Sequence, residues 1–211
     1  MIREMLELIN DRGAFFAELL AEHLRLSATA VSIAMLLGLA VGVFISESPK
    51  SAKPVMAVVN FAYTIPSISL LGFLIPLSGI GDLTAVIALT IYALLPMVRN
   101  TYAGISNVSP ELVQAALGMG STRWQLMSRI KLPLAAPVIV AGIRSMTVMT
   151  IALSGVASFI GAGGLGVAIY RGITTNNKAM TLVGSLLIAA LAISADLLIG
   201  ALEKRLKVRD T

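Results

Sequence analysis

The sequence predicts an all-α integral membrane protein, because it is apolar, poor in charge and divided into long apolar runs. Of its 211 residues, 57% are hydrophobic and 13% are charged, whereas about 25% of the residues in a soluble domain are charged. The mean hydropathy is +0.90. The apolar runs reach the roughly 20 residues that a helix needs to cross a bilayer. We therefore expect one compact membrane domain, with no soluble catalytic or nucleotide-binding domain beside it.

Five apolar runs are long enough to be spans. They are expected over residues 24–45, 55–77, 83–105, 134–160 and 179–202. Residues 1–22 predict a partly amphipathic helix at the membrane surface, since its apolar side chains can face lipid or protein. Residues 23–205 then form a single transmembrane domain, interrupted by a basic loop at about 106–133, and residues 206–211 form a tail.

Basic residues indicate how the spans are oriented. They gather after the first span, in the loop after the third span and in the C-terminal tail, at Lys50, Lys53, Arg99, Arg123, Arg129, Lys131, Lys204, Arg205, Lys207 and Arg209. With five spans these segments lie on one side, which the positive-inside rule assigns to the cytoplasm. The N-terminus is then outside. The formal net charge of +5 reflects this placement, so nucleic acid is not expected as a partner.

Prolines and buried charges mark irregular points within the spans. Pro66 and Pro76 interrupt the second predicted span, and Pro96 interrupts the third. Irregular backbone in a membrane survives only where protein or a water-filled cavity covers it. A kink for packing and a solute passage along residues 63–67 both fit. Arg144 and Asp196 lie deep in the fourth and fifth spans, where a charge is costly. We expect them to pair inside the bundle; the alternative is that each reaches separately toward the cytoplasm.

Few residue types suited to chemistry are present. The chain has no cysteine and one histidine, His23, so disulfides, thiolate metal sites and a histidine cluster are not expected. No catalytic constellation is visible, which makes a membrane enzyme a remote alternative. An ion-coupled secondary transporter predicts intramembrane carboxylates and an internal repeat, and the spans show no such duplication.

The basic loop at 106–133 contains two predicted helices. Ser109 can cap the first helix, and Pro110 suits its first turn. Glu111 lies near the positive end of the helix dipole. Apolar residues follow at three- and four-residue spacing, and glycines 118 and 120 end the helix. A second helix is expected from Ser121 to a stop at Leu132-Pro133. Small alanines and glycines suit insertion into a groove on another protein.

The spacing of this loop resembles the EAA loop of ABC-importer permeases. Gln114-Ala115-Ala116, Gly120, Ile130 and Leu132-Pro133 match the motif with its gaps, although the usual glutamate is replaced by Gln114. In that family the loop forms coupling helices that dock into a cleft of the cytoplasmic ATPase. The resemblance therefore implies the following ATPase-coupling residues: Glu111, Gln114, Ala115, Ala116, Gly118, Gly120, Arg123, Ile130, Leu132 and Pro133.

Five other segments resemble the osmoprotectant branch of these permeases, at residues 63–67, 71–77, 95–102, 141–144 and 159–166. That branch imports glycine betaine, carnitine, choline or proline betaine. The likeness covers about residues 20–205 and implies a five-span, MetI-like, type I importer fold. It also implies a second permease copy or paralogue, two ATP-binding subunits that carry ATP and magnesium, and an external substrate-binding protein. The chain itself would then hydrolyse nothing and hold no cofactor. A permease for another small solute, such as an amino acid, is the alternative.

Polar, aromatic and glycine residues suggest a solute passage. Quaternary ammonium groups favour aromatic faces, while anchoring or packing explains each aromatic equally well. No strand precedes the glycines at 161–166, which argues against a dinucleotide loop and favours a re-entrant turn. This turn is either a plain connection or part of an outer gate, and we favour the gate. The candidate passage and gate residues are Tyr63, Pro66, Ser67, Tyr92, Asn100, Ser158, Gly161, Gly163 and Gly164.

Overall fold

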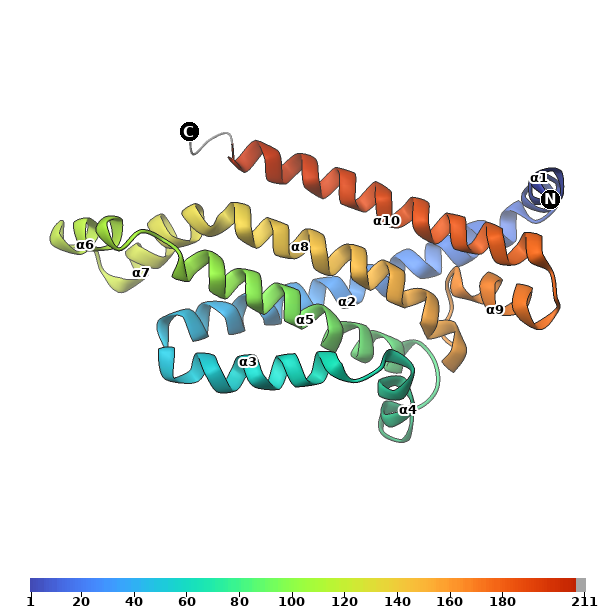
Figure 1. Cartoon of the computed structure of the whole chain (residues 1–211), viewed down its shortest axis with the longest axis horizontal. Helices are drawn as coiled ribbons and strands as arrows, with labels where there is room; N and C mark the ends of the chain where they lie inside the picture. Colours follow the sequence, from blue (N-terminus) through green and yellow to red (C-terminus); the bar gives the residue numbers. More distant parts are fainter. Residues whose placement is uncertain (208–211) are drawn as a thin grey trace.

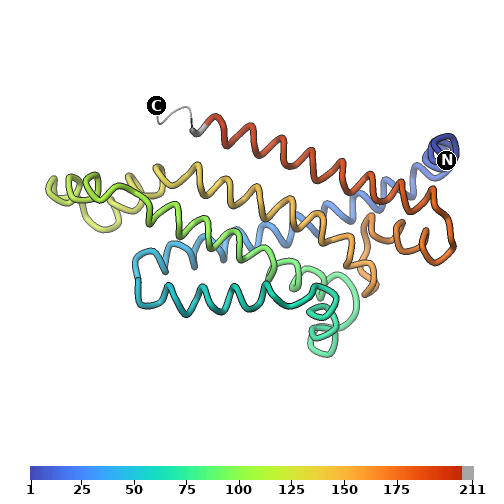
Figure 2. The backbone as a smooth tube through the Cα atoms, in the orientation of Figure 1, coloured from blue at the N-terminus to red at the C-terminus, as the bar shows by residue number. Residues whose placement is uncertain are grey.

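A computed structural model describes residues 1–207, which form an elongated bundle of helices (Figures 1 and 2). In chain order the helices are α1 (Ile2–Asp11), α2 (Gly13–Glu47), α3 (Pro49–Thr64), α4 (Ser67–Ser78), α5 (Asp82–Ser106), α6 (Pro110–Gly118), α7 (Arg123–Leu126), a π-helical turn (Met127–Lys131), α8 (Leu132–Ser154), a 3-10 segment (Gly155–Ile160), α9 (Gly166–Thr174) and α10 (Lys178–Lys207).

Among the described residues, four helices are long and apolar enough to cross a membrane. They are α2, α5, the continuous helix Arg123–Ile160 and α10. The pair α3 and α4 provides a fifth span if it is counted as one. The third and fifth predicted spans lie within two residues of α5 and of the start of α10. The predicted tail over 206–211 lies outside the described residues, apart from the last backbone turn of α10.

The predicted second span is broken into α3 and α4, which are bent by 100° relative to each other. Ile65 and Pro66 have extended backbone, with ψ of 127° and 138°. Proline lacks an N–H and pushes the residue before it out of the helical region, so the break falls here. The Tyr92 hydroxyl of α5 donates to the carbonyl oxygen of Ile65, which gives that freed group a partner.

The N-terminal segment differs from the single surface helix predicted over 1–22. Only α1 is separate, and residues 13–22 continue into the first span as one 35-residue helix, α2. Met5 and Leu8 of α1 pack against a core cluster from α2, α9 and α10, because apolar residues three apart share a helix face. Ile2 and Leu6 lie on the exposed side of α1.

The centre of the bundle is α5, which packs between α2 and α8. A Cβ atom at Gly38 or Gly42 of α2 would lie 2.6 Å from the Met97 side chain or 2.5 Å from that of Thr101. Small residues at such points allow two helix backbones to approach closely. This close packing fixes α2 against α5 along most of the membrane-crossing length.

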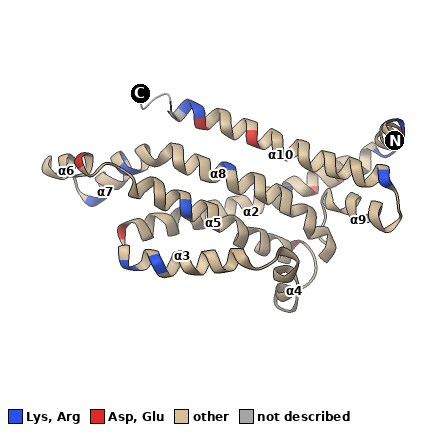
Figure 3. Cartoon of the chain, in the orientation of Figure 1, with Lys and Arg blue, Asp and Glu red and all other residues tan. Residues whose placement is uncertain are grey.

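The two ends of the bundle carry different elements. The α2–α3 turn, α6, α7 and the C-terminal end of α10 lie toward one end, and the N-terminus, α4 and α9 lie toward the other (Figure 1). Figure 3 shows Lys and Arg gathered toward the end with α6 and α7. The three basic segments therefore share one end, and the side of the membrane that this end faces stays a prediction.

Candidate coupling surface and membrane passage

The helix α6 starts at Pro110 as expected, but the capping role predicted for Ser109 is wrong. The Ser109 side chain makes no capping bond; its hydroxyl donates instead to the Glu111 carboxylate. That hydrogen bond holds the pKa of Glu111 below its usual range. The helix ends at Gly118, and Gly120 follows with a φ of +83°, a conformation that glycine adopts without strain.

The second helix of the loop begins with a capping box at Thr122. The Thr122 hydroxyl accepts from the backbone N–H of Gln125 at 3.3 Å, and the Gln125 side chain accepts from the Thr122 N–H at 2.9 Å. The two side chains satisfy backbone donors that a helix start leaves free. The short helix α7 is therefore well defined at its first turn.

The stop predicted at Leu132-Pro133 is wrong, because the helix continues from Arg123 to Ile160 without a break. The turn before Pro133 is π-helical, and the N–H of Leu132 donates to the carbonyl oxygen of Met127, five residues back. A π turn is wider than an α turn. It leaves room for a proline ring that would otherwise clash with the carbonyl four residues earlier. The second half of the loop and α8 thus form one element.

Large apolar side chains are exposed at this end of the bundle. Leu112, Leu117, Met119 and Trp124 are 49%, 49%, 80% and 77% exposed; we call these four residues the exposed coupling surface. Gln114 and Ala115 are also exposed, whereas Ala116 is buried against the chain. An exposed tryptophan is typical of residues that dominate protein–protein interfaces. None of the four residues of the exposed coupling surface was in the coupling set predicted from the sequence, although a lone tryptophan in a polar loop is a usable signal.

An ion pair joins the loop to the bundle. The Lys131 ammonium lies 2.6 Å from a carboxylate oxygen of Glu47, at the end of α2. Beside them is a cavity of about 370 Å³, lined by Gln114, Tyr102 and Lys131 among others. The exposed Gln114 side chain of α6 therefore lies at the wall of this cavity, together with residues of the bundle. The sequence analysis did not find the Lys131–Glu47 pair, which joins residues 84 positions apart.

Several of the predicted passage residues meet where the second span breaks. The rings of Tyr63 and Tyr92 are 6.0 Å apart and nearly perpendicular. The Tyr63 hydroxyl lies 3.4 Å from the sulfur of Met149 on α8. Ser67 and Tyr92 line the same small cavity, and Pro66 is exposed at the break. The structure thus brings together aromatic faces and a thioether from three helices.

Asn100 lies apart from this group and packs between helices. Its amide donates to the carbonyl oxygen of Pro96 at 2.7 Å. A Cβ atom at Gly142 of α8 would lie 2.6 Å from that of Asn100. Ser158 is also engaged locally, since its hydroxyl donates to the carbonyl oxygen of Gly155 at 3.1 Å.

Two carboxylates bind the backbone of residues 161–166, which we call the glycine loop, at the end of the bundle that carries the N-terminus. The N–H of Gly164 donates to Glu22 of α2 at 2.8 Å, and that of Gly163 to Asp82 of α5 at 3.4 Å. Asp82 also forms an ion pair with Arg25. Gly164 has a φ of +93°. The sequence analysis named the glycines and missed the carboxylates, because acidic residues near span ends are usually solvated.

Arg144 and Asp196 form a bidentate ion pair. The two distances, from Nε to Oδ1 and from the second terminal nitrogen to Oδ2, are both 2.6 Å. Glu203 joins them, with a carboxylate oxygen 3.3 Å from the Arg144 guanidinium. Glu203 follows Asp196 by seven residues, two helix turns, so this spacing was a signal for the third member. Gly200 lies between the two acids and leaves space for the guanidinium, 3.1 Å from where its Cβ would be.

Comparison with known proteins places the chain. The family model described as "Binding-protein-dependent transport system inner membrane component" matches residues 34–208. The chain belongs to this family of transport permeases. It is 41% identical over 185 residues to the carnitine transport permease protein OpuCB of Listeria monocytogenes, covering 88% of this chain and 85% of that protein. It is 41% identical over 198 residues to the osmoprotectant import permease protein OsmW of Salmonella typhimurium, covering 92% of each.

Solved structures agree on the fold of the permease. An inward-facing MetNI methionine ABC transporter aligns with a TM-score of 0.84 at 23% identity, covering 90% of this chain and 95% of that one. The predicted all-α, MetI-like fold of a type I ABC importer is thus confirmed. Family membership also favours the importer over a secondary transporter and over a membrane enzyme.

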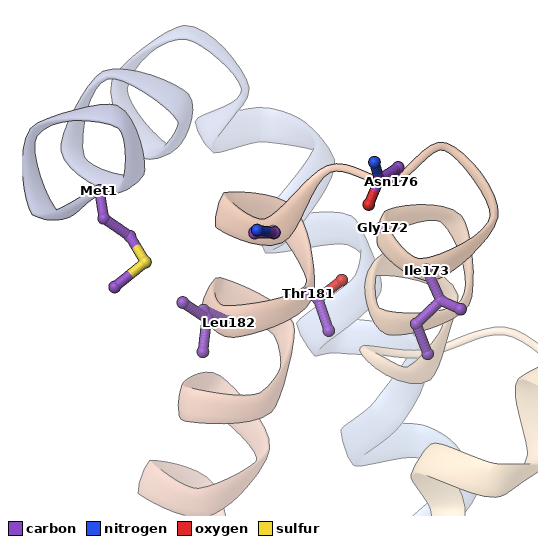
Figure 4. Close-up of a pocket in the computed structure, with 7 residues that line it drawn as sticks. Met1, Gly172, Ile173, Asn176, Thr181 and Leu182 are labelled. Atoms are coloured by element: carbon purple, nitrogen blue, oxygen red, sulfur yellow. The ribbon is translucent and has the colours of Figure 1, made fainter.

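The permease has two further cavities at the end that carries the N-terminus. One, of about 450 Å³, lies among Met1 just before α1, Ile173 of α9 and Leu182 of α10, with Lys178 also on its wall (Figure 4). The other, of about 490 Å³, lies between α2 and α9 beside the glycine loop. Within residues 1–207 no group of three or more His, Cys, Asp or Glu side chains is placed to hold a metal ion.

Proposed function

We propose that this permease belongs to an ATP-driven importer of osmoprotectants such as glycine betaine, carnitine and choline. The observation that carries the proposal is agreement among relatives of similar length. Besides the two permeases above, the glycine betaine/carnitine/choline transport system permease OpuCB of Bacillus subtilis is 35% identical over 97% of this chain. The proposed solute class follows from these names, and an amino acid is the competing solute.

The importer is proposed to contain two ATP-binding subunits, one of which docks on the exposed coupling surface of this chain, next to the motif residues Gln114, Ala115 and Gly120. The subunits carry ATP and magnesium, and this chain supplies a surface that moves with them. The unbroken helix from Arg123 to Ile160 supports this mechanism, because a displacement of α7 passes into α8 with no flexible linker. Closure of the ATPases would then reorient α8 and α5 and switch access to the passage.

A second permease, either a copy or a paralogue, and an external substrate-binding protein complete the proposed importer. We propose that the permease lies in the cell inner membrane with its N-terminus outside and its C-terminus in the cytoplasm. Supporting this orientation, the basic segments share one end of the bundle (Figure 3), as the positive-inside rule requires for the cytoplasmic side.

The passage is proposed to run past the break between α3 and α4. Tyr63 and Tyr92 offer aromatic faces to a quaternary ammonium group, beside Pro66 and Ser67. The glycine loop, with Ser158, Gly161, Gly163 and Gly164, forms the outer gate, while Asn100 and the Arg144–Asp196 pair hold helices in place. Such a passage is sparse in aromatic residues, which suits a transient path whose selectivity comes from the binding protein.

Reconstitution tests the proposal. The permease is placed in liposomes with its cognate ATPase and binding protein, and uptake of labelled glycine betaine, carnitine, choline and methionine is measured with and without internal ATP. ATP-dependent uptake of at least one of the first three solutes is expected, with none when the ATPase carries an inactivating substitution. Uptake that is the same with and without internal ATP would refute the proposal of an ATP-driven importer. Uptake of methionine alone would refute the proposed solute class.

A further inference from the structure

The cavity of about 490 Å³ between α2 and α9 is built from two facing helix surfaces. Phe15, Glu18 and Glu22 line it from α2, and Tyr170 and Arg171 line it from α9. The α2 residues are spaced by three and four positions, and so lie along one face of that helix. The glycine loop closes the cavity at Gly161 and Gly163. Its wall therefore combines two aromatic rings with two carboxylates.

A cation already occupies an aromatic face in this cavity. The guanidinium carbon of Arg171 lies 5.3 Å from the centre of the Phe15 ring, within the distance at which a cation is attracted to a ring face. Tyr170 is held in place by Phe159, at 5.4 Å between ring centres and an interplanar angle of 77°. The aromatic wall is thus ordered, and the protein's own side chain shows that it stabilises positive charge.

Carboxylates give the cavity its charge. The wall carries two carboxylates, those of Glu18 and Glu22, and one guanidinium, that of Arg171. Glu22 also accepts the N–H of Gly164 at 2.8 Å. A ligand cation here would lie beside the carboxylate that fixes the glycine loop.

We propose that this cavity binds the quaternary ammonium group of a small solute, between the ring of Phe15 and the carboxylates of Glu18 and Glu22, with Arg171 displaced by the ligand. A trimethylammonium group cannot donate hydrogen bonds, so it is recognised by aromatic faces and by charge. Both are present here. The choice of ligand rests on the proposed function, since the solutes named there carry this group.

The neighbouring cavity of Figure 4 provides a matched contrast. It is of similar size and lies at the same end of the bundle, but its wall combines apolar side chains with Asn176, Thr181 and Lys178, and none of its lining residues is acidic. An ammonium group on the wall repels a cation. The two cavities therefore predict opposite preferences for charged and neutral ligands of similar shape.

The absence of cysteine from the chain allows a direct test in the assembled permease–ATPase complex in lipid nanodiscs, without transport. A single cysteine replaces Val167 in the proposed site or Leu182 in the cavity of Figure 4. Each thiol is modified by a trimethylammonium-ethyl thiosulfonate and by neutral methyl thiosulfonate, and the ratio of the two rates is measured. We expect the ratio at Val167→Cys to exceed that at Leu182→Cys by about threefold or more, as a cation–π attraction at a partly exposed site provides.

Second-site variants separate the contributions. Phe15→Leu keeps an apolar side chain and the charge but removes the ring, and should lower the ratio to that of the contrast cavity. Arg171→Gln frees the ring and should raise it. Phe44→Leu, at an exposed phenylalanine further along α2, is the control and should change nothing.

Choline is expected to slow modification of Val167→Cys by the cationic reagent, whereas 3,3-dimethylbutanol, its uncharged isostere, is not. Equal ratios in the two cavities, or a ratio unchanged by Phe15→Leu, would overturn the site. Uptake measured in parallel keeps the two proposals apart. Transport of choline with equal ratios of modification rates in the two cavities refutes only the site. A higher ratio at Val167→Cys without transport of choline refutes only the solute class.

Discussion

Replacing Trp124 with alanine is expected to detach the ATPase from a permease that remains folded. The side chain is 77% exposed, so little of its packing lies within the chain, and the capping box at Thr122 does not involve it. A tryptophan buries about 150–250 Å² when covered, of which roughly three quarters is available to a partner here. At ~25 cal/mol per Å² this area corresponds to about 3–5 kcal/mol before the costs of association, and truncated interface anchors commonly lose ~2–4 kcal/mol. We therefore expect ATPase binding to weaken by about 30- to 1,000-fold.

The assay is binding of the purified ATPase to permease immobilised in nanodiscs, titrated for wild type and Trp124→Ala. Met119→Ala, in the same exposed coupling surface, should weaken binding less because its side chain offers less area. Phe73→Ala is the matched control, since Phe73 is 71% exposed on α4 at the other end of the bundle. Unchanged affinity in both coupling variants, with normal thermal stability, would refute docking at this surface.

Two further predictions concern the bundle itself. Gly42→Ala should destabilise the permease by about 1–3 kcal/mol, the usual cost of overpacking, because its Cβ would lie 2.5 Å from Thr101. In the matched control Gly72→Ala, the new Cβ meets nothing within 4 Å, so this variant should be neutral or slightly stabilising. The measurement is denaturant unfolding in detergent. Alanine at Arg144, at Asp196 and at both should give strongly non-additive losses of thermal stability, since the first substitution already leaves the partner charge uncompensated; strictly additive losses would show that the bidentate pair contributes nothing jointly.

Much of the fold could be predicted because the membrane imposes a simple rule. Every backbone polar group within lipid must be satisfied inside its own helix or by covering protein, so apolar run length predicts helices such as α5 closely. Pro66 marks the break between α3 and α4 for the same reason, since a proline removes a donor and the residue before it leaves the helical region. The interruptions predicted at Pro76 and Pro96 are wrong, because these prolines lie inside the continuous helices α4 and α5. The gathering of the three basic segments toward one end of the bundle was also predicted from the sequence, whereas the side of the membrane that this end faces stays a prediction.

Features that depend on contacts far apart in the chain were not predicted. No local sequence pattern predicts the Lys131–Glu47 ion pair or the hydrogen bond from the Gly164 N–H to Glu22, because each joins residues that only the packed bundle brings together. The wrong prediction at Ser109 has a different cause. The hydroxyl of a serine at a helix start can accept a hydrogen bond from a backbone N–H or donate one to a nearby acceptor, and here it donates to the Glu111 carboxylate. Local pattern identifies a helix start without fixing which hydrogen bond stabilises it.

The error at Pro133 has the largest consequence for mechanism. A proline normally signals a helix end, but a π turn absorbs it here, and the helix runs for 38 residues from Arg123 to Ile160, about 57 Å at 1.5 Å per residue. Its first residues belong to the coupling segment, and its last residue precedes Gly161 of the glycine loop. Under the proposed mechanism, motion of α7 would therefore reach the glycine loop along one helix. Its two irregular turns, the π-helical turn and the 3-10 segment, are the points at which that helix can bend.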